Sequence, residues 1–300
     1  MLFVPNDENC RLNNDQKQAV DHAFAVFMQA IDPLLQKQFR LDGFPEKLCH
    51  YTDFRGLQGI LETGALRATY TQAMNDSSEA EYGQRVVKNY VAGFPDQDAT
   101  RRLGVAMESS PQRYFACCFC ERSDLLSMWI TYAQRGGGYC LEFDGVSGLL
   151  SPAFPQFPNR LPFKMTYGMA LPEPVESILA CACDFARAGD VEASVSASWM
   201  RILSLRFKHP AFSHEEERRI VIPNPSVSAM KFQAGDTGVK PYIELRRTAP
   251  DGSRLLPLRR IVFGPTLRQD RILVETIGLM LERYGYKGVP VEPCGIPYRV

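Results

Sequence analysis

The spacing of apolar positions along the chain predicts an N-terminal helical segment. Over residues 14–40 apolar side chains recur three and four positions apart, as on one face of a helix. Pro33 would divide this helix into two pieces. Gly43 then breaks the pattern. We therefore expect residues 1–45 to form a helical extension, followed by a main domain over residues 46–300.

Strands and helices alternate irregularly in the rest of the chain. Short runs rich in β-branched and aromatic residues predict strands, and apolar residues at helical spacing predict helices. The expected strands cover residues 47–52, 66–70, 114–120, 139–143, 161–167, 217–223, 240–246, 259–263 and 288–293. The expected helices cover residues 54–63, 77–91, 95–108, 125–133, 175–205 and 268–284. This irregular order favours a mixed α+β fold over a doubly wound one.

Composition is ordinary for a soluble globular protein, with 45% hydrophobic and 23% charged residues among 300. The formal net charge is zero, so no overall charge attracts the protein to nucleic acid or to a membrane. No run approaches the roughly 20 apolar residues of a membrane helix. The first nine residues lack the basic and apolar regions of a signal peptide. These features predict a cytoplasmic protein, and they leave its oligomeric state open.

The chain holds nine cysteines, an odd number that favours reduced thiols over a disulfide framework. Three of them, Cys117, Cys118 and Cys120, lie in an apolar run that reads as a buried strand. Cys117 and Cys120 form one C-x-x-C, but a structural zinc site needs a second such pair or two spaced histidines. We therefore expect no metal.

Four polar blocks at the edges of apolar segments carry the candidate chemistry. They are residues 49–52 (CHYT), 75–79 (NDSSE), 128–132 (MWITY) and 215–219 (EEERR). The sequence has no glycine-rich dinucleotide fingerprint and no phosphate-binding P-loop to compete as an explanation.

His50 stands at the end of an expected strand, beside Tyr51 and Thr52. A neutral imidazole can donate a hydrogen bond to a ribose hydroxyl, while Thr52 or a backbone group contacts an amide. The alternative is a half-buried histidine that caps the helix expected to start near Asp53.

Asn75 and Asp76 are polar groups on a loop that could close over a ligand. The alternative is structural, because Asp76 followed by Glu79 fits the pattern of a helix capping box.

Trp129 and Tyr132 lie on a short expected helix. Either ring could stack on a nicotinamide or adenine ring if it were exposed in a cleft. The alternative for both residues is packing in the core.

Glu215 and Glu217 give the sharpest signal. If they lie in a strand, their side chains share one face and Glu216 points away. One carboxylate could contact a ribose 2′-hydroxyl and stabilise an oxocarbenium-like transition state, while the other deprotonates an acceptor. The alternative is a solvated edge at which the acids pair with Arg218 or Arg219.

The four blocks closely resemble a bacterial family known as domain of unknown function 2971. That family has an H-Y-T start, an N-D-x-x-E loop, an M-W-x-x-Y-A helix before a glycine turn, and an E-x-E-x-R strand. The matching segments here are residues 50–52, 75–79, 128–133 and 215–219, with later matches at 261–265 and 296–299. The resemblance covers residues 46–300, and the family name implies no activity.

The order of the blocks is also similar to that in ADP-ribosyltransferases. This resemblance implies two apposed, split antiparallel sheets with a cleft between them, and NAD⁺ as co-substrate without a metal. It implies that the segment of His50, Tyr51 and Thr52 holds the nicotinamide ribose and carboxamide. Tyr51 replaces the glycine that the polymerase subgroup has between the histidine and the threonine.

The same resemblance assigns roles to the later blocks. Glu217 would stabilise the oxocarbenium, and Glu215 would activate an acceptor, either a protein side chain, a nucleobase or water. Trp129 or Tyr132 would stack on a ring, and Arg219 would bind a diphosphate oxygen or pair with an acid. The function expected is that of an ADP-ribosyltransferase or NAD glycohydrolase of a bacterial toxin or phage-defence type.

The competing hypothesis is a non-catalytic module that binds a ligand or partner in a bacterial defence or toxin–antitoxin system. In such a module Glu215 and Glu217 would form structural ion pairs with the arginines that follow them.

Overall fold

A computed structural model describes residues 13–43, 45–74, 77–109, 112–144, 149–150, 163–235, 238–247, 253, 255–267 and 271–298. The helices described are α1 (Asn14–Asp42), α2 (Phe54–Thr63), α3 (Ser77–Ala92), α4 (Gln97–Glu108), α5 (Leu126–Tyr132), α6 (Glu173–Phe185), α7 (Asp190–Ser204) and α8 (Arg271–Arg283). The strands are β1 (Lys47–Thr52), β2 (Ala65–Tyr70), β3 (Tyr114–Cys120), β4 (Tyr139–Asp144), β5 (Leu149–Leu150), β6 (Phe163–Lys164), β7 (Thr166–Tyr167), β8 (Phe207–Lys208), β9 (Glu217–Pro223), β10 (Lys231–Gly235), β11 (Gly238–Arg247), β12 (Leu258–Phe263) and β13 (Val291–Pro293).

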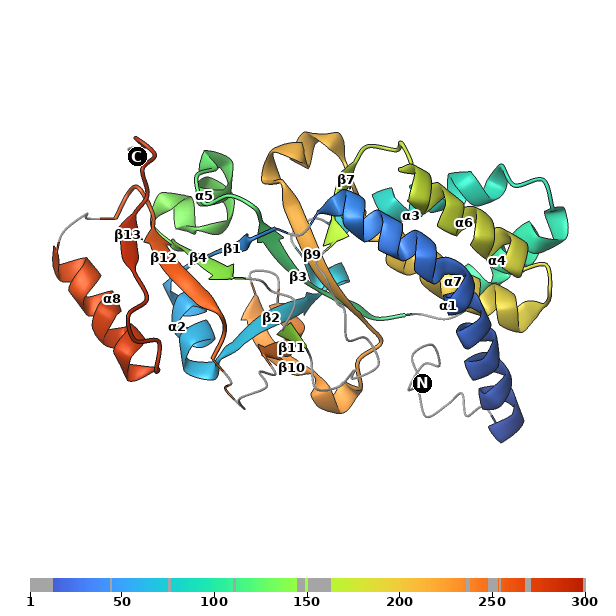
Figure 1. Ribbon diagram of the computed structural model, residues 1–300, viewed down its shortest axis with the longest axis horizontal. Helices are drawn as coiled ribbons and strands as arrows, with labels where there is room; N and C mark the ends of the chain where they lie inside the picture. Colours follow the sequence, from blue (N-terminus) through green and yellow to red (C-terminus); the bar gives the residue numbers. More distant parts are fainter. Residues whose placement is uncertain are drawn as a thin grey trace.

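Five of the described helices gather at one end of an elongated molecule and most of the sheet lies at the other, which confirms the α+β class (Figure 1). Figure 1 shows α1, α3, α4, α6 and α7 together at one end, and the sheet with α2, α5 and α8 at the other. The helical end has an apolar core of its own, to which α1 contributes Ala23, Phe27 and Ile31. The expected boundary at residue 45 stays a prediction, because α1 shares this core with helices of the expected main domain.

Helix α1 runs without a break through Pro33, so the expected division into two pieces is wrong. Asn13 caps its start, and its side chain accepts a hydrogen bond from the backbone N–H of Gln16. Buried residues lie on both sides of the proline, among them Ile31 before it and Gln38 after it. Packing along the whole helix therefore outweighs the single hydrogen bond that proline removes.

The sheet forks at β3. One edge of β3 pairs with β9 over its full length, from Tyr114 opposite Pro223 to Cys120 opposite Glu217. The other edge pairs with β2 near its start and with β1 at Cys120. One arm then continues as β1–β4–β12–β13 and the other as β2–β11–β10. Eleven of the described strands thus form one hydrogen-bonded network, where two apposed sheets with a cleft between them were expected. The other two, β7 and β8, pair with each other.

One apolar core supports the fork. It joins inward residues of β1, β3 and β4, such as Leu48, Phe119 and Phe143, to α2 and α8, which contribute Leu57 and Ile277. Among the described strands, three were absent from the sequence-based expectation, namely β5, β8 and β10. In the described part of the chain, no helix has the length and apolar character needed to cross a membrane.

Candidate functional site

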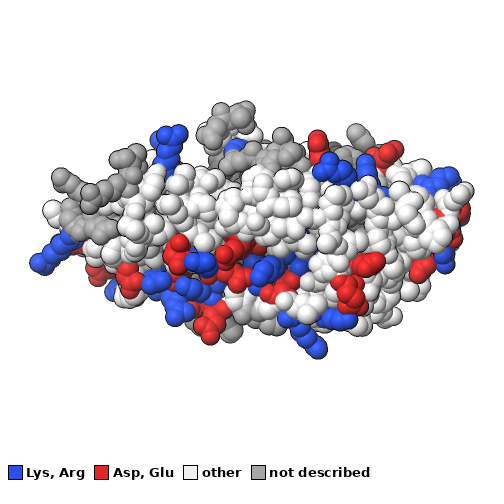
Figure 2. Space-filling model, turned by 90° about the horizontal axis from the view of Figure 1, so that it is seen from above, with Lys and Arg blue, Asp and Glu red and all other residues white. Residues whose placement is uncertain are grey.

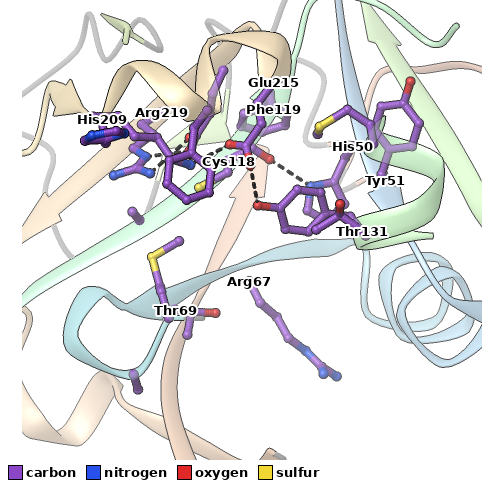
Figure 3. A pocket seen from close by; sticks show the side chains of 18 of the residues that line it. His50, Tyr51, Arg67, Thr69, Cys118, Phe119, Thr131, His209, Glu215 and Arg219 are labelled. Carbon is purple, nitrogen blue, oxygen red and sulfur yellow. Dashed lines mark hydrogen bonds and ion pairs between the residues drawn. The ribbon is translucent and has the colours of Figure 1, made fainter. Parts of the chain in front are cut away.

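A pocket of about 1000 Å³ opens where the sheet forks. Its walls come from β1, β2, β3 and β9, from α3 and α5, and from the 3₁₀ helix η4 (Pro210–Glu215). Figure 3 shows side chains from these separate elements turned toward one cavity. The fork itself creates the space, since β1 and β2 leave the same edge of β3 in different arms of the sheet.

Most of the sequence-predicted site residues come together here. The pocket-lining residues among them are His50, Tyr51, Tyr132, Glu215, Glu217 and Arg219. Thr52 and Trp129 do not line the pocket as it is described. Asn75 and Asp76 lie outside the described residues.

Glu217 forms a buried ion pair at the start of β9. One carboxylate oxygen lies 2.5 Å from Nε of Arg219, and the other lies 3.0 Å from its second guanidinium nitrogen. Nζ of Lys208, on β8, donates to the same carboxylate at 2.9 Å. The side chains of all three residues are 4% exposed. The expected solvated edge is therefore wrong, because the pair is enclosed by protein.

Glu215 reaches the same cluster by a route that the sequence pattern did not predict. It ends η4, and the chain then turns at Glu216, whose φ of 46° is left-handed, before β9 begins. The expectation that both acids share one strand face is thus wrong. Both carboxylates nevertheless meet at Lys208, which lies 2.5 Å from an oxygen of Glu215. Tyr132 donates its hydroxyl proton to the other oxygen at 2.9 Å.

Electrostatics fix the ionisation of this cluster. Burial by itself would raise the pKa of Glu217, but the charges of Arg219 and Lys208 outweigh it and hold the pKa at about 2. Burial raises the pKa of the Tyr132 phenol, with a further contribution from Glu215. At neutral pH Glu217 is therefore a carboxylate, and Tyr132 keeps the proton that it donates.

A hydrogen bond from the His50 side chain to the backbone of β3 orients the imidazole ring. Its Nδ1 lies 3.0 Å from the carbonyl oxygen of Cys118 on β3. Because a carbonyl only accepts, Nδ1 carries the proton and Nε2 has an acceptor lone pair. Burial lowers the pKa of His50, so the ring is neutral at pH 7. The alternative role as a helix cap is excluded, since Asp53 caps α2.

Cys118 connects the two candidate catalytic residues. Its carbonyl accepts a hydrogen bond from His50, and its thiol is among the groups that lower the pKa of the Glu217 carboxylate. Both candidates therefore lie against one residue in the middle of β3.

Trp129 and Thr52 make packing contacts away from the pocket. Trp129 is fully buried, its Nε1 donates to the carbonyl of Ser123 at 3.0 Å, and its ring packs edge-on against Tyr51 at 5.1 Å between centroids. The Thr52 hydroxyl lies over Gly56 so closely that a β-carbon at that glycine would clash. Trp129 is thus excluded as the stacking aromatic, since its face of α5 packs on the sheet.

Arg218 points away from the pocket and anchors α1. Because successive strand residues face opposite sides, it lies between the pocket-lining Glu217 and Arg219 without joining them. It donates to Glu121 at 2.6 Å and to the carbonyls of Asp42 and Gly43.

Sequence reasoning missed Lys208, which ties the cluster together. A signal was present in Arg206 and Lys208, two basic residues a few positions before the acidic block. Three more basic residues line the pocket and were also missed, namely Arg67, Arg85 and Lys240. Among the residues that the structure describes, no group of three His, Cys, Asp or Glu side chains is arranged to hold a metal ion.

Residues 128–220 match the model of a family described as a protein of unknown function, DUF2971. This segment contains Tyr132, Lys208 and the acidic cluster, whereas His50 lies before it. No curated protein and no solved structure matches the chain. The match supports the expected relationship to this family over the segment that carries most of the site.

Proposed function

We propose that the pocket binds NAD⁺ and that the protein cleaves the bond between nicotinamide and ribose. The ADP-ribose would pass to a protein or nucleic-acid acceptor, or to water. The observation that carries this proposal is that His50 and Glu217, from distant parts of the chain, line one pocket together with Cys118, whose carbonyl bonds to His50. The order of the sequence blocks, similar to that of ADP-ribosyltransferases, is consistent with it.

The pocket suits a dinucleotide in size and in polarity. Ligand pockets have volumes of roughly 300–1000 Å³, and this one is at the upper end of that range. Its wall combines aromatic and apolar residues such as Phe119 and Met128 with charged ones from β9 and α3. A nicotinamide ring and a charged diphosphate could therefore both find suitable surroundings.

Glu217 would stabilise the charge that develops during cleavage. When the glycosidic bond breaks, its electron pair moves to the ring nitrogen of nicotinamide, and positive charge grows on the ribose carbon. Glu217 is ionised throughout the neutral range because its pKa is about 2. A carboxylate held rigidly by Arg219 and Lys208 can stabilise that charge without first reorganising.

Glu215 would receive the proton of the acceptor when the acceptor attacks the ribose carbon. The hydroxyl of Tyr132 is bonded to that carboxylate and also lines the pocket, so it would orient the group that takes the proton. Tyr132 is also the aromatic residue assigned to stacking, now that Trp129 is known to be buried.

His50 would hold the ribose through Nε2, which can accept a hydrogen bond from a hydroxyl. Arg219 would hold Glu217 in place, since its guanidinium is buried against that carboxylate. We therefore assign Arg219 to its pairing with Glu217 and not to the diphosphate.

A second candidate function is binding without cleavage, in a module of a bacterial defence or toxin–antitoxin system. The observation that favours it is the complete pairing of both carboxylates, with Lys208 and Arg219 for Glu217 and with Lys208 and Tyr132 for Glu215. Cations this close reduce the negative potential that an oxocarbenium would experience.

The decisive experiment is nicotinamide release from NAD⁺ by the wild type, by Glu217→Gln and by Glu142→Gln, with cell lysate as the source of acceptor. Glu142 is a matched control, because it is equally buried and its pKa is also about 2, but it does not line the pocket. We expect Glu217→Gln to lower the rate by about 10²–10³, as for the loss of one transition-state contact. Glu142→Gln should retain the wild-type rate per folded molecule.

One outcome would contradict cleavage, and another would contradict the proposed role of Glu217. Absence of nicotinamide release from the wild type, with retention of NAD⁺ binding in calorimetry, would favour the binding module. Equal losses of rate in both variants would mean that Glu217 acts only through stability.

A further inference from the structure

The basic residues of the pocket fall into two groups with different surroundings. Lys208 and Arg219 are buried against the carboxylates of Glu215 and Glu217. Arg67, Arg85 and Lys240 come from β2, α3 and β11, and the first two are exposed. Figure 3 shows Arg67 and Thr69 on a different side of the cavity from Glu215 and Arg219. One region of the pocket is thus an internally neutralised cluster, and another is basic.

The contacts of Arg67 and Arg85 fix the positions of their guanidinium groups but do not neutralise their positive charges. Arg67 donates to the neutral amide of Gln233 at 2.5 Å, and its guanidinium carbon lies 4.9 Å from the ring centre of Tyr242. The guanidinium of Arg85 lies 5.3 Å from the ring centre of Tyr82. None of these contacts supplies a negative charge, so both groups remain able to pair with an anion.

Neighbouring residues add further donors to this region. The stem of Lys240 packs over Gly235, where an added β-carbon would lie 2.6 Å from it. His209 accepts the backbone N–H of Ala211 at Nδ1, at 3.2 Å, so its ring proton is on Nε2. His209 lines the pocket and therefore presents a donor. Glu81, on the same helix as Arg85, adds an acidic side chain to the described pocket wall.

The exposed positive charges of Arg67 and Arg85 contrast with the balanced charge of the rest of the chain. The protein has a formal net charge of zero, and Figure 2 shows acidic and basic side chains interspersed over one face. A concave site lined by cations attracts anions more strongly than the same charges would on an open surface, because its walls exclude water.

We propose that Arg67, Arg85, Lys240 and His209 form a subsite for the phosphate groups of a nucleotide. The diphosphate would lie along β2, β11 and α3, with the bond to be cleaved near Glu217. Arginine donates two parallel hydrogen bonds to phosphate oxygens, which gives geometry as well as charge. The position of the cleaved bond rests on the proposed function, but binding of phosphate by these residues does not require cleavage.

The test measures the binding of ADP and of adenosine by calorimetry, at low and at high salt. The variants are Arg67→Gln, Arg85→Gln and Lys240→Gln. Lys88→Gln is the matched control, since Lys88 lies on the same helix as Arg85, is exposed and does not line the pocket. We expect each arginine variant to bind ADP about tenfold more weakly, with adenosine binding unchanged. ADP affinity of the wild type should fall as salt screens these charges.

The proposal is overturned if wild type binds ADP no more tightly than adenosine, or if Arg67→Gln and Arg85→Gln bind ADP as wild type does. Nicotinamide release is read separately. If ADP binding depends on the arginines but no nicotinamide is released, the phosphate subsite stands and the cleavage function fails. If nicotinamide is released with an unchanged KM by both arginine variants, the function stands and the subsite fails.

Discussion

Glu142 and Glu217 are two buried carboxylates of the same sheet, and only one of them borders a cavity. Each is paired with an arginine and a lysine, and each has a pKa of about 2. Glu142, on β4, binds Arg260 through two hydrogen bonds of 2.7 and 2.9 Å, and Lys47 lies 3.3 Å away. By pKa alone the two sites could not be told apart.

The two sites differ in how far their cations are exposed to water. Arg260 and Lys47 are 31% and 36% exposed, so water solvates part of the charge that neutralises Glu142. Lys208 and Arg219 are 4% exposed, and Lys208 serves two carboxylates. Removing four charged groups from water is costly unless each is compensated. A lowered pKa thus reports pairing, whereas a closed cluster of this kind beside a pocket points to a site that holds its charges in place.

The largest effect is expected from Lys208→Met. It leaves Glu215 and Glu217 to share Arg219 and Tyr132 inside the protein, and should cost about 3–5 kcal/mol of unfolding free energy. Lys47→Met removes the partly exposed lysine beside Glu142, and should cost less than about 1 kcal/mol. Urea unfolding followed by circular dichroism measures both. Similar losses in the two variants would show that enclosure of the cations does not distinguish the two clusters.

Acid should destabilise the protein through both carboxylates. The folded-state pKa of Glu217, about 2, lies below its ordinary value of 4.5, so the unfolded chain binds a proton first as pH falls. The resulting stability is fully present above about pH 4.5 and is lost progressively toward pH 2. Its size is on the order of 3 kcal/mol for each carboxylate.

Urea unfolding between pH 7 and pH 3 tests this expectation. Glu217→Gln and Glu142→Gln each remove one titrating group, so the stability of each should fall less steeply with acid than that of wild type. A variant whose curve stays parallel to that of wild type would show that its carboxylate has no lowered pKa in the folded state.

A smaller effect is expected from Tyr132→Phe. Its hydroxyl donates to the charged Glu215, whereas the hydroxyl of Tyr51 donates at 2.8 Å to the neutral carbonyl of Arg122. Removing a hydrogen bond to a charged group costs about 1.5–3 kcal/mol, and to a neutral group about 0.5–1.5 kcal/mol. In thermal unfolding, the melting temperature of Tyr132→Phe should therefore be lower than that of Tyr51→Phe. The reverse order would mean that Lys208 alone satisfies Glu215.

Local pattern was sufficient to predict most elements of the fold. The strand at 114–120 has the expected bounds because a continuous apolar run of that length fits a buried strand. The strand at 217–223 also has the expected bounds, and its apolar part is residues 220–222 after three charged residues. Helix α1 differed at Pro33, where packing against α6 and α7 overrides a local penalty. Strand β10 was missed, since its exposed, mixed residues depend on pairing with β11 and carry no pattern of their own.

Sequence reasoning predicted which residues form the site better than it predicted how they are arranged. Glu215 and Glu217 do converge, but through a left-handed turn at Glu216 that no periodicity encodes. Lys208 lies in a two-residue strand whose position is set by pairing with β7, a contact between segments far apart in sequence. Trp129 shows the opposite error, since an aromatic residue on a short helix has the same sequence appearance whether it faces a cleft or the core.

The last turn of α1 gives the N-terminal helix a place in the site. Asp42 forms a buried ion pair with Arg206, and the backbone at Asp42 and Gly43 accepts hydrogen bonds from Arg218. Arg206 and Arg218 are close in sequence to Lys208 and Glu217, on the two segments that carry the acidic cluster.

A chain shortened to begin at residue 46 would therefore lose more than a peripheral helix. It would remove the oxygens of Asp42 and Gly43 from the guanidinium groups of Arg206 and Arg218, close in sequence to Lys208 and to Glu217, the carboxylate proposed to stabilise the oxocarbenium.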